Sequence, residues 1–126
     1  MGLKHEEITR RILGAAFEVH NSLGFGFIEK VYENALALEL RRHGATVEQQ
    51  KSVGVRYRGA LVGEYICDLL VDEKVLVEIK AVMRLMEAHH AQLICYLRVT
   101  GIEVGLLLNF GHSVEYKRKI LDTTSG

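Results

Sequence analysis

The sequence predicts a single α/β domain. Segments with the 3.6-residue period of amphipathic helices and segments with the two-residue alternation of strands follow one another along the chain. Its 126 residues fit one domain, and no internal repeat, low-complexity segment or proline divides it. Hydrophobic residues make up 48% and charged residues 25%, close to the averages for soluble globular proteins. We therefore expect a self-sufficient core built from elements in the order ααβββαββ.

Two helices are predicted in the first third of the chain. From Glu6 to His20, apolar residues recur at the spacing of a helix with a broad apolar face. Gly24 and Gly26 then suit a left-handed cap and a tight connection. The helical period resumes at Ile28 and ends in basic residues followed by Gly44, which is a common composition for a helix C-terminus.

Three strands are predicted next. Alternation from Thr46 to Val55 indicates a strand with one wet face near a sheet edge, followed by a turn at Arg58-Gly59. The apolar runs Tyr65–Val71 and Val75–Lys80 flank the turn-like residues 72–74. They predict two antiparallel strands.

The last part of the chain predicts one helix and two strands. The helix should run from about Glu87 to Val99 and stop at Gly101. The strand Glu103–Phe110 is almost continuously apolar, so both of its faces should be covered. Residues Ser113–Leu121 alternate and should form an outer strand.

Three charged side chains interrupt the central strand pair. Alternation places Glu78 and Lys80 on one face of their strand, and Asp68 comes from the neighbouring strand. If Asp68 shares that face, the two carboxylates repel each other unless a cation or tight hydrogen bonds compensate. Carboxylates, a backbone carbonyl and water are the ligands that Mg²⁺ or Mn²⁺ prefers. The alternative is an ordinary cross-strand salt bridge between Lys80 and one of the acids.

Two polar pairs on predicted helices could add to this site. Gln92 and Tyr96 are four residues apart on the helix that follows Lys80, and Glu29 and Tyr32 are three apart near the start of the second helix. Each pair also has a simpler interpretation. Glu29 would then be a first-turn acid favoured by the helix dipole, and both tyrosines would be core aromatics whose hydroxyls reach the surface.

Together these residues resemble the GxxExxY family of the PD-(D/E)xK nuclease superfamily. The similarity extends from the first helix to Asn109-Phe-Gly111, and its motifs are Gly26-x-x-Glu29-x-x-Tyr32, Asp68, Glu78-Ile-Lys80 and Gln92-x-x-x-Tyr96. The resemblance implies a restriction-endonuclease-like fold. In this fold an αβββαβ core with a mixed central sheet is flanked by helices, and an N-terminal helix and a C-terminal strand are added here.

The resemblance also implies a metal-dependent nuclease that hydrolyses phosphodiester bonds. Asp68, Glu78 and the backbone carbonyl of Ile79 are the expected ligands of Mg²⁺ or Mn²⁺, with Glu29 as a direct or water-mediated ligand. The family's biological substrate is generally not established.

The remaining motif residues are expected to act on the water and the substrate. Lys80 would position the attacking water for in-line displacement at phosphorus, while Gln92 and Tyr96 would fix the lysine or the substrate backbone. The resemblance implies products with a 5′-phosphate and a 3′-hydroxyl.

The expected partner is nucleic acid, DNA more than RNA. Sixteen basic residues balance sixteen acidic ones, so binding must rest on a local patch or on assembly as a homodimer. Neutral charge favours the rival interpretation, a non-catalytic nucleic-acid or protein interaction module that keeps the fold. The candidates for phosphate contacts are Arg41, Arg42, Arg56, Arg58, Lys117, Arg118 and Lys119.

A cytoplasmic location without membrane contact is expected. No apolar run is long enough to span a bilayer, and the N-terminus becomes charged too soon for a secretory signal. Cys67 and Cys95 lie in apolar runs and should be reduced, buried and inert.

Overall fold

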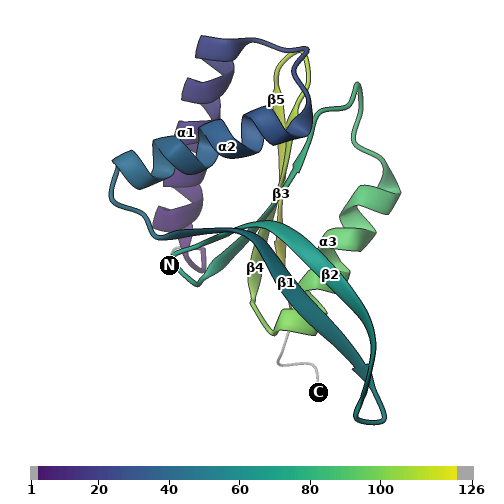
Figure 1. Ribbon diagram of the computed structural model, residues 1–126. Helices are drawn as coiled ribbons and strands as arrows, with labels where there is room; N and C mark the ends of the chain where they lie inside the picture. The colour runs from purple at the N-terminus through teal and green to yellow at the C-terminus, as the bar shows by residue number, and fades with distance from the viewer. Residues whose placement is uncertain (1–2, 122–126) are drawn as a thin grey trace.

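The computed structural model describes residues 3–121, and its elements follow the predicted order (Figure 1). The helices are α1 (Glu6–Leu23), α2 (Glu29–Arg42) and α3 (Glu87–Thr100). The strands are β1 (Val47–Tyr57), β2 (Ala60–Val71), β3 (Val75–Lys80), β4 (Val104–Phe110) and β5 (Val114–Ile120). The main difference from the prediction is that β2 begins at Ala60, because it pairs with β1 along its whole length.

The strands form one mixed sheet in the order β1-β2-β3-β4-β5. Only β3 and β4 are parallel, and α3 connects them as the crossover that a parallel pair requires. The edge positions of β1 and β5 agree with the predictions for these strands. All seven residues of β4 are buried, as its continuous apolar sequence predicts.

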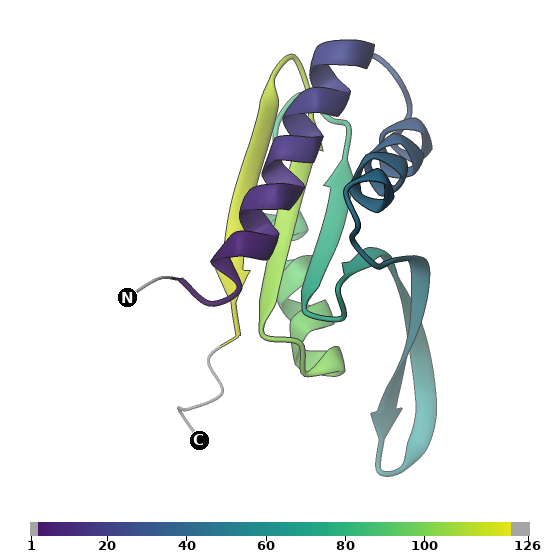
Figure 2. The same cartoon turned by 90° about the vertical axis from the view of Figure 1, so that its left-hand side faces the viewer.

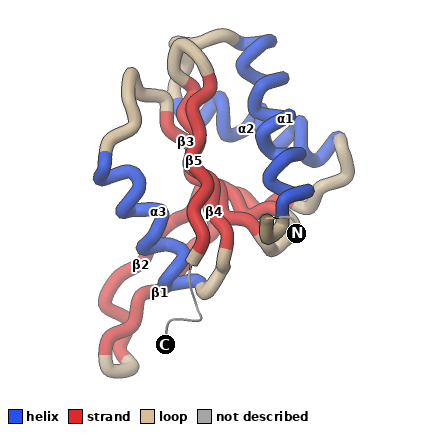
Figure 3. The backbone as a smooth tube through the Cα atoms, turned by 180° about the vertical axis from the view of Figure 1, so that it is seen from behind, coloured by secondary structure: helices blue, strands red, loops and turns tan. Residues whose placement is uncertain are grey.

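Helices cover both faces of the sheet. Figures 2 and 3 show α1 and α2 on one face and α3 on the other. The larger core cluster joins α1 and α2 to alternate residues of β3 and β4, whereas a smaller cluster under α3 contains Cys67, Leu70, Leu76, Tyr96 and Leu97. Gly105 allows α3 to pack closely, because a Cβ there would lie 2.9 Å from Leu93 Cδ1.

A two-stranded ribbon projects from this body. Strand β2 pairs with β3 only over Leu69–Val71, but its pairing with β1 continues outward to the turn at Arg58-Gly59. We call residues 50–68 the β1–β2 ribbon, which extends away from the sheet in Figures 1 and 2. The ribbon leaves the sheet at Asp68, so that residue lies where β2 and β3 separate.

The loop between α1 and α2 is held by Tyr32. This side chain is fully buried and stacks on Phe110 with 4.6 Å between ring centroids. Its hydroxyl donates a hydrogen bond to the Gly24 carbonyl (2.6 Å) and accepts one from the Phe27 amide (3.3 Å). Tyr32 is therefore a core aromatic, the simpler of the two interpretations, although its hydroxyl is bonded to the loop.

The two cysteines are free, but they differ in environment. Cys67 is buried, and burial together with the nearby Glu78 raises the pKa of its thiol to about 12. Cys95 is only half-buried, which corrects the expectation that both thiols are buried. It lies outside the buried face of α3, which is formed by Leu93, Tyr96 and Leu97. Among residues 3–121, no helix is long and apolar enough to cross a membrane.

Candidate functional site

Asp68 and Glu78 meet where β2 separates from β3. The last paired residues are Leu69 and Val77, and the next position in register brings Asp68 opposite Glu78. At this position, backbone amides donate hydrogen bonds to side-chain carboxylates instead of to the backbone carbonyls of the neighbouring strand. The Ile79 amide donates to Asp68 Oδ2 (2.7 Å), and the Asp68 amide donates to Glu78 Oε1 (3.3 Å). The structure therefore brings the two carboxylates together, as strand alternation predicts.

Burial makes both carboxylates reluctant to ionise. Glu78 is 4% exposed, and desolvation, with repulsion from Asp68, raises its pKa to about 8. Burial also raises the pKa of Asp68, although the hydrogen bond from the Ile79 amide opposes the shift. The pair consequently favours a bound proton or a bound cation.

Lys80 lies beside this pair without closing an ion pair. Its charge lowers the pKa of both Asp68 and Glu78, but more weakly than burial raises them. Within residues 3–121, no ion pair joins its ammonium to either acid. The cross-strand salt bridge that was the alternative interpretation is thus not formed.

Three further predicted residues lie at different distances from the centre. Glu29 is exposed in the first turn of α2, and its charge raises the pKa of Asp68 and Glu78 only weakly. Tyr96 is buried, and burial is the largest cause that raises the pKa of its phenol. The charge of Glu78 is the second cause, so the phenol lies near the carboxylates. Gln92 is half-buried, and its side chain makes no hydrogen bond within the described part of the chain.

Glu33 on α2 also lies near the centre, although it was not among the predicted site residues. Its carboxylate is 4% exposed and accepts hydrogen bonds from the side-chain amides of Gln50 (2.7 Å) and Gln49 (2.8 Å). Its charge raises the pKa of Asp68, more strongly than Lys80 lowers it. A signal was available, because Glu33 lies four residues after Glu29 and so lies on the same side of α2.

Gln50 connects Glu33 to Asp68. Its amide nitrogen lies 2.7 Å from Glu33 Oε1 and 3.4 Å from Asp68 Oδ1. The Gln50 backbone has φ 54°, a left-handed conformation that is costly for a residue with a Cβ and that often marks functional sites. Strand alternation carries no signal of this conformation, so the sequence could not have revealed it.

The donors present fit a hard divalent cation. Asp68 and Glu78 each accept one backbone amide through one oxygen and retain a second oxygen, and the Ile79 carbonyl belongs to the residue whose amide binds Asp68. Among the described residues, no group of three or more His, Cys, Asp or Glu side chains is arranged to hold a metal. Two carboxylates, a carbonyl and several waters are a donor set that Mg²⁺ accepts.

A comparison with protein families shows which family the chain belongs to. The family described as the PD-(D/E)XK nuclease superfamily matches residues 6–120. The chain belongs to this superfamily. The sequence matches no curated protein.

Two solved structures share the superfamily fold. One is the crystal structure of SSO0001, with 20% identity and a TM-score of 0.57, covering 74% of this chain and 50% of that one. The other is an alkaline exonuclease from Laribacter hongkongensis, with 15% identity and a TM-score of 0.56, covering 74% of this chain and 56% of that one. The matched region thus spans only about half of each of these structures.

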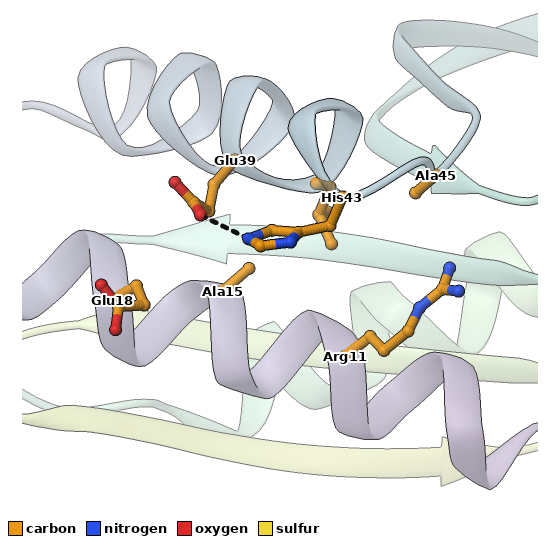
Figure 4. A pocket seen from close by; sticks show the side chains of 7 residues that line it. Arg11, Ala15, Glu18, Glu39, His43 and Ala45 are labelled. Carbon is orange, nitrogen blue, oxygen red and sulfur yellow. Dashed lines mark hydrogen bonds and ion pairs between the residues drawn. The ribbon is translucent and has the colours of Figure 1, made fainter.

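A hollow of about 330 Å³ between α1 and α2 contains none of the predicted site residues (Figure 4). Three of its charged or titratable side chains, Arg11, Glu39 and His43, are paired within the chain. Arg11 contacts Asp72 Oδ2 at 2.9 Å, and the His43 ring contacts Glu39 Oε2 at 2.8 Å. The predicted site residues therefore lie outside this hollow.

Proposed function

We propose that this protein is a metal-dependent nuclease of the GxxExxY type that hydrolyses phosphodiester bonds, in DNA more than in RNA. The observation that carries the proposal is the contact between Asp68 and Glu78. The buried Glu78 and the half-buried Asp68 both have raised pKa values, and both lie beside Lys80. Membership of the nuclease superfamily supports the same chemistry.

Asp68, Glu78 and the Ile79 carbonyl would hold Mg²⁺ or Mn²⁺, with Glu29 as a direct or water-mediated ligand. A cation bound there would stabilise the negative charge that develops on the attacked phosphate and lower the pKa of a water molecule. Glu33 and Gln50 would position Asp68, because the Gln50 side-chain nitrogen lies 3.4 Å from Asp68 Oδ1 and is itself held by Glu33 on α2.

Lys80 would orient the attacking water in line with the leaving oxygen, and its charge would stabilise the phosphate under attack. Tyr96, packed edge-on against Tyr65 at 5.0 Å, and Gln92 would fix the lysine or the substrate backbone. The products would carry a 5′-phosphate and a 3′-hydroxyl.

A cleavage assay tests this proposal. The purified protein is incubated with single-stranded DNA, duplex DNA and RNA in Mg²⁺, Mn²⁺ or EDTA. We expect Lys80→Ala and Asp68→Asn to reduce metal-dependent cleavage by about 100-fold or more. Lys74→Ala in the β2–β3 turn, which removes an exposed lysine, should leave cleavage unchanged.

Two other results would contradict the proposal. Cleavage that survives both site substitutions would indicate a contaminating nuclease. Absence of cleavage on every substrate would favour a non-catalytic interaction module.

Calorimetric titration with Mn²⁺ tests the metal site directly. Asp68→Asn should abolish binding, whereas Lys74→Ala should not change it. We also propose that two copies associate to enlarge the small binding surface, which a solution mass measurement with and without DNA will check.

A further inference from the structure

Exposed aromatic side chains surround a hollow beside the proposed centre. We define the aromatic rim as Phe25, Phe27, Met83 and His112, which line a hollow of about 400 Å³ between the α1–α2 loop, the end of β3 and the β4–β5 turn. Phe25, Phe27 and Met83 are 56%, 46% and 79% exposed. Such a group of exposed apolar side chains marks a binding surface more often than an ordinary surface.

Hydrogen bonds hold both walls of this hollow. On one side, the Phe27 amide is bonded to the buried Tyr32 hydroxyl. On the other side, the fully buried Asn109 binds both the amide (2.9 Å) and the carbonyl (2.8 Å) of Val82, the residue before Met83. The rim is therefore preformed, so a ligand would pay little entropy to order it.

The rings of the rim present stacking faces. Phe25 packs against His112 with ring centroids 4.0 Å apart and an angle of 42° between their planes. Phe27 meets Tyr32 edge-on at 6.1 Å, which leaves the Phe27 ring half-exposed. Aromatic faces on a cleft suit flat, apolar π-systems.

Both walls of the rim lie close to residues of the proposed nuclease centre along the chain. Val82 follows Lys80 by two residues, which is roughly 7 Å along an extended chain. On the opposite wall, Phe27 precedes Glu29 by two residues, and the charge of Glu29 reaches both Asp68 and Glu78. The exposed Arg84, directly after Met83, adds positive charge on the path leading away from Lys80.

We propose that the aromatic rim stacks on an unpaired nucleobase of a strand whose phosphate lies at Lys80. The substrate class is then single-stranded nucleic acid, or a duplex end that has frayed, because base pairing and stacking hide the base faces inside a duplex. Stacking on aromatic side chains is how proteins bind single strands without reading their sequence. This inference rests on the proposed nuclease function.

Binding measurements separate this inference from the nuclease proposal. Fluorescence anisotropy measures the binding of a single-stranded oligonucleotide and of a blunt duplex with the same sequence, each in Ca²⁺ and in EDTA. Wild type is compared with the variants Phe25→Ala, Phe27→Ala and Phe17→Ala. The last variant is the matched control, because Phe17 on α1 is 45% exposed and lies outside the rim. Circular dichroism confirms that each variant is folded.

We expect Phe27→Ala and Phe25→Ala to bind the single strand roughly 5- to 100-fold more weakly than wild type, and Phe17→Ala to bind it equally well. Duplex binding should change by less than about twofold in all three, since phosphate contacts dominate it. A 2-aminopurine base in the strand should change fluorescence on binding to wild type but not to Phe27→Ala.

Equal single-strand binding by wild type and both rim variants overturns the inference, as does a wild type that binds only duplex. Either result leaves the nuclease proposal to the cleavage assay with Lys80→Ala and Asp68→Asn. Conversely, rim-dependent binding of single strands without any cleavage would support the inference about the rim and contradict the nuclease proposal. Binding to apolar peptides or lipid vesicles in place of the oligonucleotide would also overturn it.

Discussion

Glu78 is an acid placed almost entirely out of water. Strand β3 is buried from Val75 to Ile79, and within residues 3–121 the negative charge of Glu78 is compensated by the Asp68 amide and by Lys80. These do not balance the cost of desolvation, and the pKa is raised to about 8. Near neutral pH the metal-free protein therefore keeps a proton on this carboxyl.

This shift predicts a pH-dependent stability. Because the pKa of Glu78 is raised on folding, the folded state binds more protons than the unfolded state between about pH 4.5 and 8. The stabilising contribution is complete below this range and is lost as the pH rises through it. We expect the free energy of unfolding of Glu78→Gln, measured with urea in EDTA, to rise relative to that of wild type as the pH increases. The change from pH 5 to pH 8.5 should be on the order of 2–4 kcal/mol. Parallel pH profiles for the two proteins would contradict the raised pKa.

Glu33 and Glu29 should respond differently to truncation. Glu33→Ala removes a buried acceptor that holds the side-chain amides of both Gln49 and Gln50, so we expect a loss of about 1–3 kcal/mol in the free energy of unfolding. Glu29→Ala changes an exposed side chain and should alter stability by less than about 0.5 kcal/mol. Mn²⁺ titration of both variants then shows which acid contributes to metal affinity. Equal stability losses would contradict the different burial of the two acids.

At the scale of elements, the end of the β2–β3 ladder creates the site. Backbone pairing stops at Leu69 and Val77, and the next amides, those of Asp68 and Ile79, bond to side-chain carboxylates. A continuous ladder would have used these amides for pairing. The separation of the two strands is thus what makes the amides available to the carboxylates.

The left-handed Gln50 predicts an unusual substitution order. Both Gln50→Ala and Gln50→Gly lose the amide that bridges Glu33 and Asp68, so they differ mainly in backbone preference. Glycine adopts φ 54° without a Cβ penalty, so Gln50→Gly should be more stable than Gln50→Ala by about 1 kcal/mol. In an ordinary strand the order is reversed. Chemical denaturation of the two variants measures the difference, and a more stable alanine variant would argue against the left-handed backbone.

At the scale of the whole molecule, the chain combines a dense two-sided core with a thinly supported ribbon. Strands β3 and β4 lie between two layers of helices, while the outer part of the β1–β2 ribbon is exposed. The charges of the chain balance to zero, so no general positive field assists the binding of nucleic acid. Affinity must then come from local contacts around the centre.

This contrast predicts uneven hydrogen exchange. Backbone amides of β3 and β4 should exchange only through global unfolding, whereas those of residues 54–64 in the ribbon should exchange at least roughly tenfold faster through local opening. Exchange monitored by NMR or mass spectrometry measures both sets in one sample. A ribbon as protected as β4 would indicate that another chain covers it, and dilution would then accelerate its exchange.

The sequence by itself determined the eight elements, their order and the common face of Glu78 and Lys80, whereas the meeting of Asp68 with Glu78 needed the structure. These features depend on local periodicity, on turn residues and on the alternation of a strand, all of which act over a few neighbouring positions. The nuclease-superfamily resemblance followed from the same residues and is confirmed at the level of the superfamily.

Only the tertiary structure decided the surroundings of that centre. Glu33 on α2 and Gln50 on β1 reach Asp68 through contacts that join segments far apart in the chain, and Tyr32 belongs to the core because Phe110 stacks on it. Burial, pKa shifts and left-handed strain arise from packing between elements, and no local pattern encodes them. The sequence therefore determined which residues could form a metal centre, and the fold decided which of them are buried together.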